Sequence, residues 1–124
     1  MKKTLEDRVL RYFAAVDGED IATLLDTLTE DCVFRVETHG IELKGHEEIR
    51  GMFERLWSEH KTVRHEEFRH VADPDKGRIA SQFKVVNTLH DGSLARKSNC
   101  NFFTLRDERF CAVSVYMTGS NTLT

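Results

Sequence analysis

The first side chain that could take part in chemistry is Tyr12, which lies in an amphipathic segment near the start of the chain. Leu5, Val9 and Val16 surround it at helical spacing, so the pattern predicts a helix that turns Tyr12 inward. A tyrosine suits a half-wet position because its ring is apolar and its hydroxyl is polar. We expect Tyr12 either to donate a hydrogen bond into a cavity, as the catalytic candidate of the chain, or to fill the core. A lone donor seldom catalyses without a base.

The six histidines suggest a metal site at first sight, but their spacing does not support one. His46-Glu47-Glu48 and His65-Glu66-Glu67 lack the pair of histidines on one helix face that zinc enzymes use. His65 and His70 are five residues apart on a predicted strand, where alternation sends them to opposite faces. We therefore predict solvated histidines, no metal and no cofactor.

The three cysteines, Cys32, Cys100 and Cys111, are far apart, and each lies in an apolar stretch. This pattern is typical of buried free thiols in a reducing compartment, so a cytoplasmic protein is expected. Cys100 would need a neighbouring base or cation to act as a nucleophile. Its predicted neighbours are apolar, which favours an inert thiol.

Length and charge narrow the class of protein. The 124 residues suit one domain over residues 1–124 with one core. Lys plus Arg number 18 and Asp plus Glu 21, which gives a net charge of −3. The two signs are interspersed without a basic patch, so nucleic acid is not expected as a partner. No apolar run has the length of a membrane span or the pattern of a signal peptide, so membrane association is not expected.

The hydrophobic pattern also predicts the elements that must position these side chains. Helices are expected over residues 5–16, 21–28 and 46–60, and strands over 32–38, 41–44, 63–71, 78–90, 93–105 and 109–117. Helices segregated from a run of antiparallel strands give an α+β layer fold. Because the later strands are long, the sheet should bend. We predict a cone-shaped, curved antiparallel sheet covered by the three helices of the N-terminal half.

Pairing the strands across their turns predicts which face lines the cone. If Asp91-Gly92 is a two-residue turn, Phe83 lies opposite Cys100. If residues 107–108 form the next turn, Cys100 lies opposite Val115. The mostly apolar face should then look toward the helices, and the other face is polar enough for water or a subunit contact. A bulge or a slip of one residue would exchange the two faces.

The predicted pocket combines the inner face of the sheet with the third helix, because ligand cavities are lined mainly by apolar and aromatic side chains. Besides Tyr12, its expected lining residues are Phe34, Val36, Phe53, Trp57, Phe83, Val85, Asn87, Ser98, Cys100, Phe102, Val115 and Met117. Only Tyr12, Asn87 and Ser98 give this face polar groups that could orient a ligand. We therefore expect a hydrophobic small molecule as the partner.

Several stretches of the chain resemble a known family. Residues 11–20, Arg-Tyr-Phe-Ala-Ala-Val-Asp-Gly-Glu-Asp, and residues 29–34, Thr-Glu-Asp-Cys-Val-Phe, are similar to the opening of SnoaL-like and ketosteroid-isomerase-like domains. Residues 45–50, 102–110 and 116–118 are similar to their third helix, last hairpin and closing segment. The resemblance implies the nuclear-transport-factor-2-like, or cystatin-like, cone. It also implies a homodimer formed through the open sheet face.

Ketosteroid isomerases move a proton beside a carbonyl group. An aspartate takes the proton while a tyrosine and a protonated aspartate hold the enolate oxygen. The resemblance assigns the tyrosine to Tyr12, but the base position falls on Val36 and the second donor on Cys100 or Asn101. The acid that SnoaL-like cyclases need near the end of the last strand corresponds to Thr118. The frame is therefore present without the carboxyl groups of either scheme.

Three functions fit these observations. The first is a metal-free isomerase, cyclase or dehydratase that acts on a hydrophobic carbonyl compound, by analogy with the resembling proteins. The second is a non-catalytic binder of an apolar ligand, because the predicted inner face has few polar groups. The third is a dimerisation or interaction domain that uses the polar outer face with Tyr116.

Overall fold

The first helix begins at a complete N-terminal cap. The computed structural model describes residues 3–119, and α1 spans Leu5–Asp17. The Thr4 hydroxyl accepts a hydrogen bond from the backbone N–H of Asp7 at 3.1 Å, and the Asp7 carboxylate accepts one from the N–H of Thr4 at 3.3 Å. The helix buries Tyr12, as its spacing predicts.

The other elements follow the predicted order with boundaries shifted by a few residues. They are α2 (Ile21–Asp26), β1 (Leu28–Val36), the 3-10 helix η1 (Glu37–His39), β2 (Ile41–Lys44), α3 (Gly45–Glu59), β3 (Thr62–Asp73), β4 (Arg78–Thr88), β5 (Leu94–Arg106) and β6 (Arg109–Tyr116). The second helix ends earlier than expected because Leu28 begins β1, where it is fully buried and pairs with Phe110 of β6.

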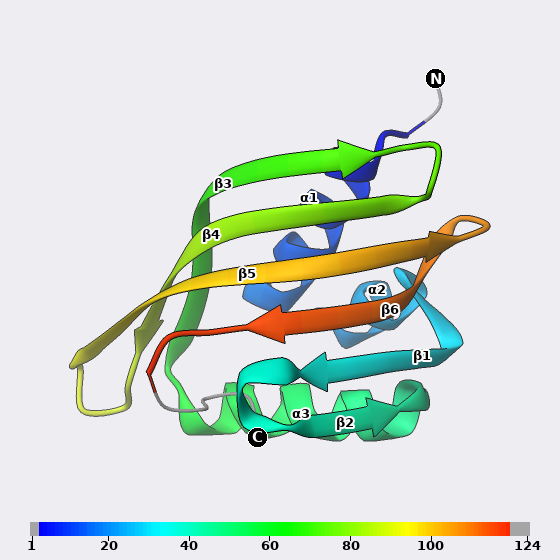
Figure 1. Cartoon of the computed structure of the whole chain (residues 1–124). Helices are drawn as coiled ribbons and strands as arrows, with labels where there is room; N and C mark the ends of the chain where they lie inside the picture. Colours follow the sequence, from blue (N-terminus) through cyan, green and yellow to red (C-terminus); the bar gives the residue numbers. More distant parts are fainter. Residues whose placement is uncertain (1–2, 120–124) are drawn as a thin grey trace.

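The described strands form one sheet in the order β2-β1-β6-β5-β4-β3. Neighbouring strands are antiparallel except β1 and β6, which run parallel. The expectation of a wholly antiparallel sheet is therefore wrong at this pair, because helix α3 and several strands, and not a hairpin, connect β1 to β6. Figure 1 shows the sheet in front of α1 and α2, with the long strands β3 to β5 bending at one end.

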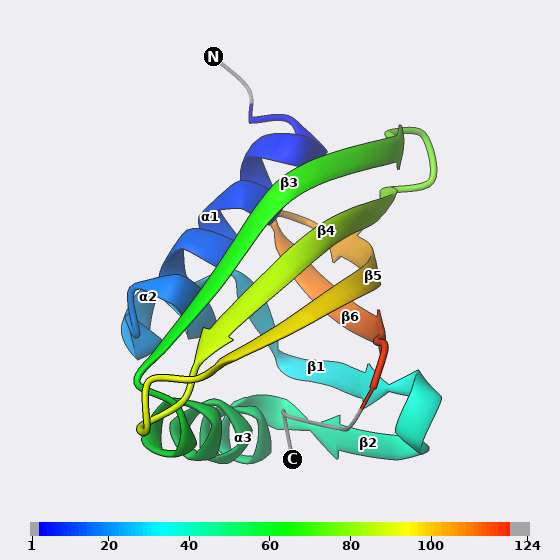
Figure 2. The same cartoon turned by 90° about the vertical axis from the view of Figure 1, so that its left-hand side faces the viewer.

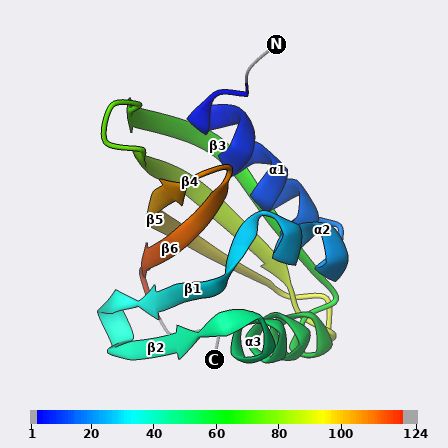
Figure 3. The same ribbon diagram turned by 90° about the vertical axis from the view of Figure 1, so that its right-hand side faces the viewer.

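The helices cover one face of this bent sheet. Helix α1 packs on β3 and β4, α2 on β1, and α3 on β1 and β2. Figures 2 and 3 show from two sides that the helices gather on the concave side of the sheet. We call this side the inner face and the opposite side the outer face. The core between helices and sheet includes Phe34, Phe53, Phe103 and Phe110. The predicted α+β cone is thus confirmed.

The turn between β4 and β5 is longer than the predicted two residues. Leu89 and Ser93 face each other across it, with the Leu89 N–H donating to the Ser93 carbonyl at 2.9 Å. The loop between them has three residues and ends at Gly92, whose φ of +88° is left-handed. The added residue shifts the pairing by one, so Phe83 lies opposite Asn99 and not opposite Cys100.

A β-bulge then shifts the pairing of β5 with β6 by one residue as well. The turn at residues 107–108 is as predicted, with Arg106 opposite Arg109. Beyond it the register shifts, and Cys111 is left between the pairs that Phe110 and Ala112 form with β5. Asn101, and not Cys100, lies opposite Val115. The two shifts cancel between β4 and β6, so the side chains of these two strands face as predicted. The side chains of β5 face the opposite way from the prediction.

The facing of β5 predicted from the sequence is therefore wrong. Ser98 and Phe102 are exposed and Cys100 is half-buried on the outer face. The inner face of β5 instead carries the side chains of Lys97, Asn99, Asn101 and Phe103. A polar stripe thus runs along a central strand of the cone, where the sequence predicted an apolar one.

No helix within residues 3–119 has both the length and the apolar composition needed to cross a membrane.

Candidate functional site

Tyr12 lies among the aromatic side chains of the core. Its ring makes edge contacts with Phe13, Phe53 and Phe103 at centroid distances of 4.9, 6.4 and 5.3 Å. Only 2% of the residue is exposed. Burial and, to a lesser extent, the nearby Cys32 thiol raise the pKa of Tyr12 above its usual value. The phenol therefore stays protonated and can donate a hydrogen bond, but it does not act as a base.

Asp17 and His65 form a polar pair at the edge of this core. Asp17, the last residue of α1, accepts a hydrogen bond through Oδ2 from the backbone N–H of His65 at 2.9 Å. Its Oδ1 lies 2.5 Å from Nδ1 of the imidazole, and the side chains of His65 and Asp17 are 11% and 26% exposed. The carboxylate favours the proton on Nδ1, which leaves the lone pair of the neutral ring on Nε2. This ring can accept a proton, and Asp17 would stabilise the imidazolium.

The position of His65 depends on a β-bulge in β3. The pairing with β4 shifts by one residue between Glu66 and Arg69, and Glu67 has a φ of 56°. The extra residue places His65 and His70 on the inner face, although an unbroken strand would put them on opposite faces. The prediction that these two rings face opposite ways in solvent is therefore wrong.

Both imidazoles are held by buried neighbours. Phe13 and Phe83 flank the ring of His65 at centroid distances of 4.8 and 5.5 Å. Nδ1 of His70 lies 2.8 Å from Oγ of Ser81, a residue with no exposed surface. The inner face of β3 therefore carries two imidazole groups, each in contact with residues of β4.

A small cavity lies between α1, α3 and the inner face of the sheet. Its volume is about 30 Å³, which gives room for roughly one or two water molecules. It is lined by Tyr12, Phe13, Val16, Phe34, Phe53, Leu56, His65, Phe83, Val85, Asn87, Asn99, Asn101 and Val115. Mostly apolar walls with a few polar groups are typical of a small-molecule site. A larger ligand requires the bordering side chains to move.

Three asparagines leave unpaired oxygens around this cavity. The Oδ1 atoms of Asn87, Asn99 and Asn101 are shielded from solvent and have no hydrogen-bond partner among the described residues. Asn87 is 2% exposed and Asn101 is 3% exposed. A buried acceptor without a partner costs about 1–3 kcal/mol. A molecule that brought hydrogen-bond donors into the cavity would remove this cost.

Half of the lining residues predicted from the sequence border the cavity, namely Phe34, Phe53, Phe83, Val85, Asn87 and Val115. Val36 and Met117 are buried in the core outside its lining. Trp57 is half-buried and donates its indole N–H to the Val16 carbonyl at 3.0 Å. The remaining three are the outer-face residues of β5. Phe13, His65, Asn99 and Asn101 border the cavity and were absent from the predicted lining.

Two of the positions to which the sequence resemblance assigns acids, Val36 and Thr118, hold no carboxyl group. Val36 is fully buried and apolar. Oγ1 of Thr118 accepts a hydrogen bond from the backbone N–H of Ser98 at 3.1 Å, and its carbonyl accepts one from Nζ of Lys97 at 2.7 Å. Burial lowers the pKa of Lys97. Thr118 therefore fastens the chain to β5, and His65 is the candidate base of the cavity.

Two further histidines, His46 and His60, contact backbone carbonyls near the site. Nε2 of His46 lies 3.0 Å from the Leu28 carbonyl, and Nδ1 of His60 lies 2.8 Å from the Leu56 carbonyl. His60 is only 6% exposed, so it is not the solvated side chain that we predicted. Among residues 3–119, no three His, Cys, Asp or Glu side chains are grouped so that they could hold a metal ion.

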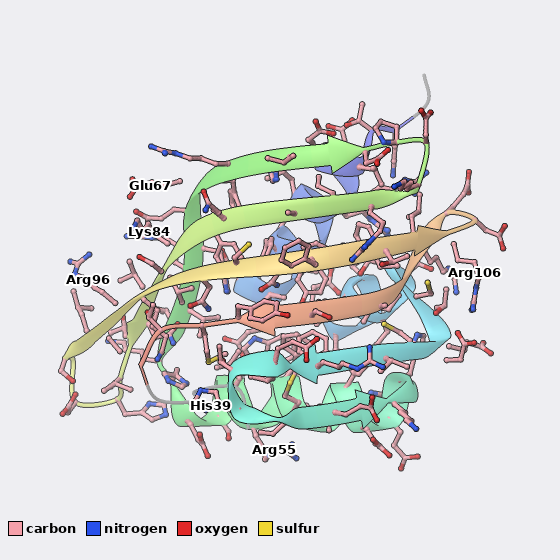
Figure 4. All side chains as sticks on the ribbon, in the orientation of Figure 1. His39, Arg55, Glu67, Lys84, Arg96 and Arg106 are labelled. Carbon is pink, nitrogen blue, oxygen red and sulfur yellow. The ribbon has the colours of Figure 1, made fainter. Side chains whose placement is uncertain are left out.

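A wider groove of about 450 Å³ lies on the outer face. Its border is formed largely by the exposed or half-buried side chains of Glu67, Arg69, Gln82, Lys84, Ser98, Cys100 and Tyr116. Figure 4 shows Glu67, Lys84 and Arg96 together at the bent end of the sheet. Glu67, Arg69 and Lys84 are exposed to water, and Lys84 donates a hydrogen bond to Ser98 at 2.7 Å, so the groove residues within the described part of the chain include no carboxylate or amine removed from solvent. The smaller inner cavity is the better candidate for chemistry.

The match to a protein family extends over most of the chain. Residues 9–113 match the model of the SnoaL-like domain. The chain belongs to the SnoaL-like family. Among curated proteins, none matches it.

Solved structures resemble this SnoaL-like domain at low sequence identity. A protein of Xanthomonas campestris, provisionally assigned as a polyketide cyclase, is 18% identical with a TM-score of 0.83 over 90% of this chain and 87% of its own. A Pseudomonas putida protein with the same provisional assignment is 19% identical with a TM-score of 0.83 over 93% and 92%. A Catenulispora acidiphila protein of ketosteroid-isomerase-like fold, solved with trimethylamine, is 15% identical with a TM-score of 0.80 over 91% and 86%. These similarities confirm the predicted fold.

Proposed function

We propose that this SnoaL-like domain binds a small molecule in its inner cavity and moves a proton on it, as an isomerase, cyclase or dehydratase. The observation that carries the proposal is the Asp17–His65 pair, whose imidazole borders the same cavity as Tyr12 and Asn101. A base oriented by a carboxylate, next to buried hydrogen-bond donors, is the combination that proton transfer beside a carbonyl requires. Provisional assignment of similar structures as polyketide cyclases supports the same class of reaction.

The residues divide the reaction between them. Nε2 of His65 takes a proton from the carbon next to the carbonyl, and the electron pair of that C–H bond moves to the carbonyl oxygen. The hydroxyl of Tyr12 and the amide N–H of Asn101 donate hydrogen bonds to the enolate oxygen, while Asp17 stabilises the imidazolium. Return of the proton to another carbon gives an isomer. Alternatively, attack of the enolate carbon on a second carbonyl closes a ring, and the imidazolium gives its proton to the oxygen of that carbonyl.

The walls of the cavity favour a hydrophobic carbonyl compound. Phe13, Phe34, Phe53 and Phe83 line it, and a low-dielectric wall strengthens the interactions that hold a developing enolate. The lining residues within the described part of the chain include no carboxylate, and Asp17 acts through His65. In this arrangement the base is His65, because the apolar side chain of Val36 cannot take a proton.

Deuterium exchange tests the proposed function without a known product. The protein is incubated in D₂O with a panel of cyclic ketones, enones and 1,3-diketones, and deuterium uptake beside the carbonyl is followed by NMR. We expect catalysed exchange for at least one aromatic or alicyclic ketone, and a loss of about 10²–10⁴-fold in the rate with His65→Gln. His39→Gln, at an exposed position of η1, is the matched control and should keep the rate.

Two results would decide against a catalytic role. Equal exchange rates for His65→Gln and the unchanged protein would remove the base from the mechanism. Ligand binding by calorimetry without catalysed exchange of any bound ketone would favour the alternative, a non-catalytic binder.

The outer face supports a homodimer as the assembled form. Val71, Ala80 and Phe102 lie in one row across β3, β4 and β5, and Val71 is 76% exposed. Phe102 and Tyr116 are 40% and 43% exposed, and their rings meet edge to face at 5.9 Å. Apolar and aromatic groups that remain exposed on a sheet are typical of a subunit contact.

The three free cysteines also suit the reducing cytoplasm.

A further inference from the structure

Two of the three cysteines, far apart in the sequence, are neighbours in the sheet. Val33 of β1 and Ala112 of β6 are partners in the parallel pair, and Cys32 and Cys111 are the residues that immediately precede them. Neighbouring strands lie about 4.8 Å apart. A disulfide joins residues whose Cα atoms are about 4.4–6.8 Å apart. The sheet therefore brings the two thiols close to the distance at which they can bond.

The alternation of the strands turns both thiols toward the same side. Phe34 and Val113, each two positions after a cysteine, pair with each other and are buried in the core. Residues two positions apart on a strand point to the same face, so Cys32 and Cys111 point inward as well. Cys32 has no exposed surface, whereas Cys111 is half-buried. The pair thus combines one thiol in the core with one thiol that reagents in solution can reach.

The pairing of both strands is irregular at the cysteines. The register of β1 against β6 shifts between Leu28 and Val33, and Cys111 is the extra residue of the bulge that β6 forms against β5. A residue at such a position has no regular ladder partner to hold its backbone. Cys32 and Cys111 can therefore adjust to the geometry of a disulfide without breaking the ladder that begins at Val33.

The charges of the two thiols influence each other, as expected for close neighbours. Burial, and next Cys111, raises the pKa of Cys32 to about 12, while Arg106 acts in the opposite direction. The pKa of Arg106 is raised mainly by its hydrogen bond with Asp31, and Cys111 adds to this effect. Arg106 therefore lies near both sulfur atoms. A cation in this place favours the thiolate form that disulfide exchange needs.

We propose that Cys32 and Cys111 form a reversible intramolecular disulfide between β1 and β6 when the protein meets a low-molecular-weight disulfide. The accessible Cys111 attacks one sulfur of that molecule as a thiolate, and the S–S bond breaks to release one half. Cys32 then loses its proton and attacks the sulfur of Cys111, which releases the second half. Two protein thiols are oxidised, the small disulfide is reduced to two thiols, and the two protons end on these thiols.

The third cysteine is too distant to join either partner. Cys100 lies on the outer face of β5 opposite Tyr116. The stretch of β6 from Cys111 to Tyr116 covers about 16 Å, which is more than a disulfide spans. Cys100 is therefore expected to stop at a mixed disulfide with the small molecule, and Cys100→Ala removes this side reaction without touching the pair.

The pair adjoins the inner cavity. Cys32 lies near Tyr12, since burial and then Cys32 raise the pKa of that phenol. Tyr12 in turn borders the cavity. Because the interior is closely packed, moving the sulfur atom of Cys32 toward Cys111 should change the surroundings of the Tyr12 ring. The cross-link would thus make the cavity responsive to oxidation, whatever reaction takes place there.

Peptide mapping of the folded Cys100→Ala protein tests the proposal. The protein is incubated with glutathione disulfide, alkylated and digested without reduction. We expect mass spectrometry to find the peptides of Cys32 and Cys111 linked, with the loss of two hydrogens, and dithiothreitol to separate them. Two free thiols after the incubation, or a link that forms only in urea, would overturn the proposal.

The stability of the oxidised form shows whether the folded sheet accommodates the bond. A cross-link between residues 32 and 111 closes a long loop in the unfolded chain, so oxidation should raise the melting temperature by at least about 5 °C. The ring signals of Tyr12 should shift in NMR spectra, while those of Tyr116 on the outer face stay in place. A lower melting temperature would mean that β1 and β6 must separate to form the bond, and would overturn the proposal.

Two variants in the Cys100→Ala background assign the roles of the thiols. Cys32→Ala should stop at a mixed disulfide between glutathione and Cys111, because no second thiol releases it. Cys111→Ala should leave Cys32 unmodified, since Cys32 has no exposed surface. Rapid modification of Cys32 in folded Cys111→Ala would contradict the proposed order of attack. Should Cys32→Ala fail to fold, Cys111→Ala and the peptide map decide.

Discussion

Asp17 and His65 are 48 residues apart in the sequence, and one carboxylate joins them through both of its oxygens. The contact to the backbone N–H fixes the start of β3 against the end of α1. The contact to Nδ1 fixes the ring. The same side chain therefore fastens a strand and orients a base, and the two roles can be separated by substitution.

Asp17→Asn should impair the reaction more than the fold. The amide keeps one acceptor for the backbone N–H of His65 but no longer carries the charge that stabilises an imidazolium. We expect deuterium exchange to slow by about 100-fold or more. Ligand affinity should stay within a few fold of that of the unchanged protein. The measurement compares exchange rates with dissociation constants from NMR titration. A parallel loss of both quantities would assign Asp17 to folding alone.

The bulge that places His65 makes a prediction about backbone strain. Glu67 has a φ of 56°, which glycine adopts without a steric penalty. Glu67→Gly should therefore leave the free energy of unfolding unchanged or raise it by up to about 1 kcal/mol, as measured by urea unfolding. Glu66→Gly, one position earlier, removes the contact with Arg64 and gains no such relief, so it should destabilise. The opposite order of the two variants would show that the strain at Glu67 is not significant.

The order of elements was predictable because it depends on local signals. Helical spacing in α1 and α3 and the turn residues of the later strands act within a few positions, and the structure keeps them. The facing of β5 was not predictable in the same way. An Asp-Gly pair fits both a two-residue turn and the three-residue loop that ends at Gly92, and the choice reverses every side chain of the strand.

The candidate site was harder to predict than the fold because it depends on irregular positions. Asn99 and Asn101 alternate with Ser98 and Cys100, so a correct register alone would have brought them inside. His65 had no such signal, because the residue in the left-handed conformation at the bulge is Glu67 and not glycine. A bulge of this kind is set by contacts of the whole sheet and not by local sequence.

An ion-pair cluster on the surface predicts how the fold responds to acid. Asp26 lies between Arg11 and Arg109, at 2.9 and 3.1 Å. The hydrogen bond from Arg11, followed by the charge of Arg109, lowers the pKa of Asp26. A pKa that is lower in the folded state stabilises the fold above the unfolded value of about 3.9, and this stabilisation is lost as the pH falls through the folded pKa.

Asp26→Asn should therefore lower the melting temperature at pH 7. The difference in melting temperature from the unchanged protein should disappear as the pH falls through the folded pKa of Asp26. The effect should shrink with added salt, since the cluster is exposed. Asp75→Asn, in the exposed turn after β3, is the control with the same change of charge. A difference in melting temperature between Asp26→Asn and the unchanged protein that persisted at low pH would mean that packing, and not the charge of Asp26, stabilises this region.

The cysteines should differ in reactivity according to their place in the sheet. Burial, and next the neighbouring Cys111, raises the pKa of Cys32 to about 12, and this residue has no exposed surface. Cys100 and Cys111 are half-buried, and burial raises the pKa of Cys100. At pH 8 we expect iodoacetamide to label Cys32 last, and only after unfolding in urea. Mass spectrometry of the peptides gives the order, and early labelling of Cys32 would contradict its burial.

The outer face gives a prediction for assembly. Phe102→Lys places a charge in the row of Val71 and Ala80 and should convert the proposed homodimer into a monomer at micromolar concentration, because removing an ammonium group from water in the contact costs free energy. Leu10→Lys is the matched control, since Leu10 is 43% exposed on α1 and Phe102 is 40% exposed on β5. Light scattering measures the mass of both variants. A dimer that persisted in Phe102→Lys, or that dissociated in Leu10→Lys, would place the subunit contact elsewhere than on the outer face.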